Sequence, residues 1–236
     1  MRIVFDARSV FPGMGGIGRA TASLARELDT LLEGTHELVV LVGTRRPAEP
    51  LVRGASARTV AVPAAMIDPE FEQIRLPGLL AELEADLYHG TCFAVPLARG
   101  CARTVATVHD VVFRRHPELV GQGLRAYLDR WTEVSCELAD ALVTVSEFSR
   151  REIAELYGRP AEKITVVPNA VDEAFFELPR PRTHSTLPYI LSVGALEPKF
   201  WATLVGALGM PELAADPFGA DPDTGKKVER AFLGNT

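Results

Sequence analysis

The sequence predicts an α/β fold in which a Rossmann-like parallel sheet is flanked by helices. Three observations support this prediction: short β-branched runs recur along the chain, stretches with a helical apolar period separate them, and most runs end in a polar residue. Strands that alternate with helices are typical of βαβ units and of a parallel sheet. We predict strands over residues 2–6, 37–42, 58–62, 86–89, 104–110, 141–146 and 163–169.

The helices between these strands are predicted from their apolar repeat and from their end signals. Pro77-Gly78 should kink or break the second helix, because proline removes a backbone donor and clashes with the preceding turn. Gly158 should end the last helix with a left-handed cap. The stretch 111–123 shows no clear period and is expected to wrap the ligand crevice. The predicted helices cover about residues 17–28, 69–84, 124–138 and 146–158.

The composition restricts the classes of protein. The 236 residues suffice for one large or two small domains, and 47% of them are apolar, which provides a sizeable core. The formal net charge is −6 and no basic stripe is present, so nucleic acid is disfavoured as a partner. No stretch reaches about eighteen uninterrupted apolar residues, so no membrane span is expected.

The first residues and the cysteines indicate a cytoplasmic protein. The initial apolar run is short and ends in Asp6, as in a strand and not as in a signal peptide. Cys92, Cys101 and Cys136 match no zinc or redox motif, so we expect reduced thiols. No spacing of His, Cys, Asp and Glu indicates a metal site. The basic run 114–116 is either a solvated loop or a contact for phosphate or anionic lipid, which leaves peripheral binding at the inner membrane surface open.

Polar residues at the predicted strand ends form the candidate site, because ligands of open parallel sheets bind outside the carboxyl ends of the strands. His109 can donate to a hydroxyl group or stabilise charge, and Asp110 can orient it or act as a base. Alternatively, His109 bonds only the local backbone. Ser146 is either a helix N-cap or part of an anion-binding cluster of amides. The residues expected along one edge of the crevice are Asp6, His89, His109, Asp110, Ser146 and Asn169.

A glycine-rich loop, 13–18, fits the G-x-G-x-x-G pattern, whose backbone amides can bind an anion near a helix N-terminus. A dinucleotide site needs the first glycine directly after the strand, but six residues separate Asp6 from Gly13. The second strand also leads into Gly43 without an acidic residue. These departures favour a loop that cradles phosphate over an NAD site; a plain flexible turn is the other alternative.

Five short motifs follow one another along the chain: Gly15–Arg19, Tyr88–Gly90, Thr107–Val111, Val143–Ser149 and Val167–Asp172. Together they resemble glycosyltransferase family 4, and five motifs in the correct order are far more specific than any one of them. A run at 189–194 is similar to the first strand of that family's second domain, so the resemblance covers about residues 1–197.

The resemblance implies a GT-B architecture, in which two Rossmann-like domains face each other across a cleft. The first domain would bind the acceptor and the second most of a nucleotide-sugar, and transfer would proceed with retention and without a metal or other cofactor. The amides of Gly15 and Gly16 would approach the donor diphosphate. His109 would meet the donor sugar, with Asp110 supporting its loop. Ser146 and Asn169 would lie on the cleft floor or the hinge side.

The chain departs from the family after residue 197. Lys199 can take a basic position that faces the leaving diphosphate, but Phe200 replaces the second cation. We place the domain boundary near residue 180, with a linker, one strand and a helical tail as an incomplete second domain over 181–236. Residues 193–218 resemble a segment of family III coenzyme A transferases, through a fusion, a frameshift, an artificial join or chance. The unpaired strand leaves self-association open.

The expected function is transfer of a hexose, of the mannose or glucose type, from a nucleotide-sugar. The acceptor would be a glycan, a lipid-linked sugar or a small molecule, and the chain as it stands is expected to be an incomplete enzyme. The first alternative is a non-catalytic domain that binds the acceptor or a partner chain. A remote alternative is a fusion related to coenzyme A transferases.

Overall fold

A computed structural model of the chain describes residues 1–47 and 49–169, which belong to a compact unit, Met1–Glu177. The expected linker, the strand at 189–194, the basic residue Lys199 and the tail that resembles coenzyme A transferases lie outside the described residues. The boundary near residue 180 therefore stays a prediction.

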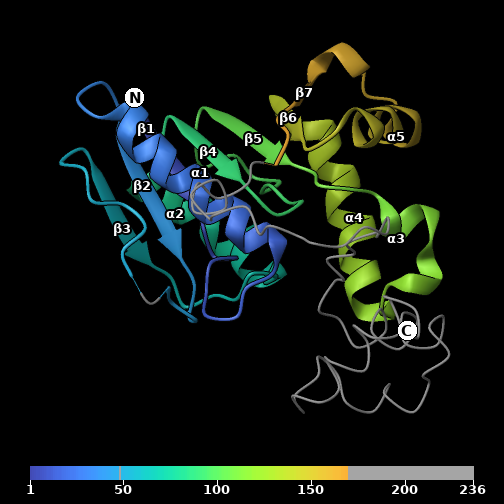
Figure 1. The fold of residues 1–236 in the computed structure, drawn as a ribbon, viewed down its shortest axis with the longest axis horizontal. Coiled ribbons are helices and arrows are strands. Elements are labelled where there is room, and N and C mark those ends of the chain that lie inside the picture. Colours follow the sequence, from blue (N-terminus) through green and yellow to red (C-terminus); the bar gives the residue numbers. More distant parts are fainter. Residues whose placement is uncertain (48, 170–236) are drawn as a thin grey trace, which may run out of the picture. The chain divides into compact units, whose positions relative to one another are not determined.

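The described part is built on one seven-stranded parallel sheet with the order β3-β2-β1-β4-β5-β6-β7 (Figure 1). All six neighbouring pairs run parallel, which confirms the predicted fold class. The strands are β1 (Arg2–Asp6), β2 (Glu37–Val42), β3 (Ala57–Ala61), β4 (Leu87–Gly90), β5 (Arg103–Thr107), β6 (Ala141–Thr144) and β7 (Ile164–Val166).

The strand order places a topological switch point between β1 and β4. Phe5 of β1 is in register with Val40 of β2 on one side and with His89 of β4 on the other. The chain first builds outward from β1 to β3, and then returns to build from β4 to β7. Open α/β sheets bind ligands outside the carboxyl ends of the strands at such a point.

Helices cover both faces of the sheet and define two hydrophobic clusters (Figure 1). Helix α1 packs Ala22 and Ala25 against Phe5 and Val40 on one face. The other face carries the larger cluster, to which α2, α4 and α5 contribute buried residues such as Leu80, Leu128 and Ile153. The helices are α1 (Gly16–Leu32), α2 (Leu76–Glu82), α3 (Val112–Arg115), α4 (Gln122–Leu138) and α5 (Glu147–Tyr157), with short 3₁₀ turns at Pro117–Leu119 and Ala161–Lys163.

Two predicted features differ from the structure. The second helix does not break at Pro77-Gly78; a wider π-helical turn, Phe71–Arg75, precedes α2 and proline lies in its first turn. A wider turn accommodates a residue that lacks an N–H and crowds the preceding carbonyl. The stretch 111–123 is also more regular than expected, since it contains α3 and a 3₁₀ turn.

The last three strands end earlier than predicted, at Thr107, Thr144 and Val166. The β-branched residues that follow are typical of strands, but they lie outside the strands. His109 and Asn169 therefore lie in loops just beyond the carboxyl ends. Helix α5 ends as expected, with Gly158 in the left-handed region at φ 66°. Among the helices of the described part, none is long and apolar enough to cross a membrane.

Candidate functional site

A relay of hydrogen bonds joins the carboxyl ends of β1, β4 and β5 to the start of α5. The hydroxyl of Thr91 donates to the carbonyl of Asp6 at 2.7 Å, and the carbonyl of Thr91 accepts from Nε2 of His109 at 2.9 Å. The carbonyl of His109 in turn accepts from the hydroxyl of Ser149 at 3.1 Å. Oγ of Ser146 accepts from the amide of Ser149 at 3.0 Å, so Ser146 is the N-cap of α5. The relay fixes the relative positions of loops that are distant in the sequence.

Beside this relay, a cavity of about 200 Å³ lies between α1 and the ends of β5, β6 and β7. Among the described residues that line it, Glu27 is the one charged side chain and no lysine or arginine contributes. A wall without cations suits a neutral ligand better than a phosphate. The polar part of the lining is Thr21, Ser23, Glu27, Thr91, Thr107, His109 and Asn169, and the apolar part is Ala20, Leu24, Val143, Val145, Val167 and Pro168.

His109 is the chemically most versatile residue of this cavity. A carbonyl oxygen can only accept, so the bond to Thr91 requires the proton on Nε2. The ring is half-buried and makes an edge contact with Phe93, at 5.7 Å between centroids. Burial lowers the pKa of His109 below its usual value, which keeps the imidazole neutral near pH 7. A neutral ring with Nε2 protonated carries its lone pair on Nδ1.

Asp110 lines a different hollow from His109. Its exposed carboxylate accepts from the amide of Val112 at 3.0 Å and so turns the chain into α3. The hollow has a volume of about 420 Å³ and also includes Arg115 and Phe148. The structure therefore places Asp110 where it supports the loop, and its carboxylate makes no hydrogen bond to the His109 ring in the described part of the chain.

Asp6 does not line the crevice edge as expected, because its side chain turns into the interior and is only 7% exposed. Arg8 donates to both of its carboxylate oxygens, and the hydroxyl of Tyr88 donates to Oδ2 at 2.8 Å. Burial opposes the charge on Asp6, but the guanidinium of Arg8 outweighs it and holds the pKa below the usual value. Asp6 is a structural acid whose backbone carbonyl, not its side chain, joins the relay.

No sequence pattern indicates the second acid of this buried group, Glu72. Glu72 accepts from Nη2 of Arg8 at 3.0 Å and from the hydroxyl of Tyr127 at 2.7 Å. Burial raises the pKa of Glu72, against the opposing effect of Arg8. Residues 8, 72 and 127 are far apart along the chain, and no spacing pattern connects them.

His89 lies near the cavity but does not line it. Its Nε2 is hydrogen-bonded to Oγ1 of Thr107 at 2.8 Å, and its ring packs edge-on against Phe5. Burial lowers the pKa of His89 to about 4, so this side chain is neutral near pH 7. The contacts tie His89 to the sheet, and Thr107 is the member of the pair that reaches the cavity.

Comparison with known proteins identifies the family of this fold. The model of Glycosyltransferase Family 4 matches residues 14–175. The chain belongs to glycosyltransferase family 4. A curated relative, the O-antigen chain mannosyltransferase B of Escherichia coli, is 30% identical over 124 residues, which are 48% of this chain and 31% of that protein. A solved structure, HepE of Anabaena in complex with UDP and glucose, gives a TM-score of 0.42 at 16% identity and covers 75% of this chain and 46% of that one.

This family 4 chain thus spans less than half the length of both relatives. The match to the family model includes all five motifs in full.

The glycines of the family 4 loop have different structural surroundings. A Cβ at Gly18 would meet the carbonyl oxygen of Ser9 at 2.4 Å and Cβ of Met14 at 2.7 Å, so this glycine permits close packing of α1. At Gly15 and Gly16 a Cβ would meet nothing within 4 Å. Packing within the described residues therefore does not require them. They lie one turn before the α1 residues of the His109 cavity and do not line it.

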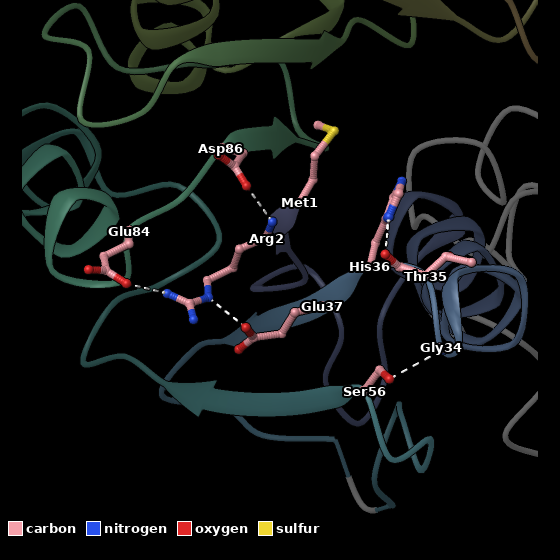
Figure 2. A pocket seen from close by; sticks show the side chains of 9 residues that line it. All are labelled: Met1, Arg2, Gly34, Thr35, His36, Glu37, Ser56, Glu84 and Asp86. Atoms are coloured by element: carbon pink, nitrogen blue, oxygen red, sulfur yellow. Dashed lines mark hydrogen bonds and ion pairs between the residues drawn. The ribbon is translucent and has the colours of Figure 1, made fainter.

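A wider hollow of about 540 Å³ lies at the opposite, amino-terminal edge of the sheet (Figure 2). Arg2 crosses it and bonds Glu37 at 2.7 Å and Glu84 at 3.2 Å, while its amide donates to Asp86 at 2.6 Å. These acids are therefore already partnered, and the hollow is at the wrong edge for a ligand of a parallel sheet. In the described part of the chain, no group of three or more His, Cys, Asp or Glu side chains could hold a metal ion.

Proposed function

We propose that this family 4 domain takes part in transferring a hexosyl residue, of the mannose or glucose type, from a nucleotide-sugar to a hydroxyl group of an acceptor. The acceptor would be a glycan, a lipid-linked sugar or a small molecule, and transfer would retain the anomeric configuration without a metal. The observation that carries the proposal is His109, a neutral imidazole that Thr91 holds at the carboxyl edge and that lines a cavity to which the described residues contribute no cation.

The two parts of the proposed site suit the two parts of a nucleotide-sugar. The cavity beside His109 offers hydroxyl groups and one imidazole lone pair, which suit the neutral hydroxyls of a sugar. The first turn of α1 has no side-chain cap, and its amides and helix dipole favour an anion such as the diphosphate. The open space at Gly15 and Gly16 lets such a group approach. Lys199 would add a cation by its resemblance to the family.

In the proposed reaction, the acceptor oxygen forms a bond to the anomeric carbon while the bond from that carbon to the diphosphate breaks. The hydroxyl proton passes to the departing nucleoside diphosphate, so atoms and charge balance. His109 would orient the sugar by accepting from one of its hydroxyls. Asp110 would act indirectly, by holding the loop through the amide of Val112.

The test compares the chain with two histidine variants in solutions of UDP-glucose or GDP-mannose with and without a simple sugar acceptor. Release of nucleoside diphosphate and glycoside formation are measured. His109→Ala should lower turnover by about 100-fold or more, the scale of a lost positioned polar group. His36→Ala is the matched control, because His36 lies at the opposite edge of the sheet (Figure 2) and should leave turnover unchanged.

Measurable turnover that is equal in the wild-type chain and in His109→Ala would remove His109 from the mechanism. Calorimetry distinguishes sugar transfer from the alternative function. Binding of an acceptor without any turnover would favour an acceptor-binding or partner-binding domain. A cytoplasmic location, peripheral membrane contact and self-association are further parts of the proposal that need separate tests, such as fractionation and sedimentation.

A further inference from the structure

The turn at the end of β4, residues 90–94, includes a residue in a conformation that bulky side chains avoid. Phe93 has φ 66°, in the left-handed region that is unfavourable for a bulky side chain. Its amide donates to the carbonyl of Thr107 at 3.0 Å, and the amide of Ala94 donates to Cys92 at 2.8 Å. A Cβ at Gly90 would meet the carbonyl oxygen of Ala94 at 2.2 Å. Such strain persists where surrounding contacts enforce it, and it gathers at functional sites.

The result of this turn is a buried threonine between two strand ends. Thr91 is 4% exposed, and its hydroxyl and its carbonyl both take part in the relay. The hydroxyl anchors the residue to the carbonyl of Asp6, which belongs to the next strand of the sheet. The backbone carbonyl is thereby aimed at Nε2 of His109. The His109 ring also makes an edge contact with Phe93, a residue of the same turn.

We propose that Thr91 is a positioning residue that holds the neutral His109 ring with its proton on Nε2 and presents the Nδ1 lone pair to a hydroxyl group of a ligand in the adjoining cavity. Only the statement about the ligand rests on the proposed function. The protonation and the anchoring are properties of the chain alone, so they can be tested without any substrate.

The chemistry follows from what each partner can do. A carbonyl oxygen accepts and never donates, so it selects the ring form that has a proton on Nε2. That form has one acceptor left, Nδ1, and no donor for the ligand. A hydroxyl group can donate to Nδ1, whereas a phosphate oxygen without a proton cannot. In the described part of the chain Nδ1 has no hydrogen-bond partner, and the lining contributes no cation.

The experiment is nitrogen-15 NMR of the full chain at pH 8, with histidine labelled in the ring. In the wild-type chain, His109 should show a protonated Nε2, an unprotonated Nδ1 and an Nε2 proton that exchanges slowly with water. Thr91→Val removes the anchoring hydroxyl at almost constant shape and should accelerate this exchange by about 10-fold or more, as expected for the loss of roughly one hydrogen bond. Thr91→Ser keeps the hydroxyl and should keep the slow exchange.

Thr104→Val is the matched control for the loss of a buried threonine hydroxyl. Thr104 is at the start of β5, where its hydroxyl bonds Asp140, away from the carboxyl edge. It should leave the signals of His109 unchanged. A wild-type His109 with its proton on Nδ1 would overturn the proposal, as would equally slow exchange in Thr91→Val and the wild-type chain. If Thr91→Val does not fold, the position of the His109 proton in the wild-type chain and its exchange rate in Thr91→Ser still test the proposal.

The outcome is separable from that of the transfer assay. If the chain transfers no sugar but the nitrogen signals are as expected, Thr91 still positions His109 and the proposed substrate is wrong. If transfer occurs but Nδ1 carries the proton, the positioning role fails and the proposed function stands.

Discussion

The guanidinium of Arg8 forms a two-pronged contact with Asp6, with Nε 3.0 Å from Oδ1 and Nη2 2.8 Å from Oδ2. Both side chains are buried, at 4% exposure for Arg8 and 7% for Asp6. The contact folds the chain back on itself directly after β1. Because Glu72 bonds the same guanidinium, one cation neutralises parts of two buried acids.

We expect Arg8→Met to lower the free energy of unfolding by about 3–5 kcal/mol, the usual result of leaving buried charges without their partner. Urea unfolding measures the change. Arg58→Met is the control, because Arg58 pairs with Glu37 at the exposed edge strand and such surface pairs contribute at most about 1 kcal/mol. Similar losses in both variants would show that the buried pair has no special weight.

The glycine-rich loop should contain two kinds of glycine: one that is needed for packing and one that leaves room for a ligand. Gly18→Ala should lower the unfolding temperature, because the new methyl group would overlap the carbonyl of Ser9. Gly16→Ala should keep the stability or raise it by up to about 1 kcal/mol, since alanine favours the helix and meets no neighbour. Thermal unfolding followed by circular dichroism distinguishes the two.

Gly16→Ala should weaken the binding of a nucleotide-sugar, although it does not lower the stability. A methyl group at Gly16 would stand where the diphosphate is proposed to lie, so calorimetry should find weaker binding in a variant of full stability. Gly16→Ala with unchanged affinity would place the diphosphate elsewhere.

Acid should destabilise the fold through His89. Burial lowers its pKa from 6.5 to about 4 in the folded chain, so between these values the unfolded chain binds more protons. The contribution to stability is complete above pH 6.5 and is lost as the pH falls toward 4. At about 1.36 kcal/mol per pKa unit, the loss amounts to roughly 3 kcal/mol.

His89→Gln isolates this effect from the carboxylates that titrate in the same range. Glutamine keeps a polar atom near Thr107 but has no proton to gain. Plots of unfolding free energy against pH should therefore be shallower for the variant between pH 6.5 and pH 4. Parallel plots would mean that His89 is not the group responsible.

The parts of the fold that could be predicted are those whose signal is local. Strands β1 and β2 have the expected bounds, because each is a compact apolar run flanked by polar residues. The cap at Gly158 followed from a glycine at the end of an apolar repeat. The overextended strand at 104–110 shows the limit: Val108 suits a strand, but sheet pairing ends at Thr107.

The candidate site was predictable as a set of strand ends but not in its detail. Topology alone places His109 at the carboxyl edge, and the structure adds that Thr91 determines which ring nitrogen is available. The orientation of Asp6 depends on Tyr88, which is 82 residues away in sequence. Contacts of that separation leave no periodic trace, so a buried structural acid and an exposed functional one have the same appearance in sequence.

Substitutions of Ser146 can distinguish its role as a helix cap from its proposed place at the cleft. The two roles predict different results for Ser146→Asp. Ser146→Ala should cost about 1 kcal/mol, since the amide of Ser149 loses its acceptor. Ser146→Asp should restore the stability, because aspartate is a good N-cap and its charge suits the helix dipole. If Ser146 only caps α5, turnover should follow stability and recover in Ser146→Asp. If the side chain faces a ligand phosphate, the added negative charge should weaken nucleotide-sugar binding in a fully stable chain, and calorimetry beside urea unfolding decides between the two.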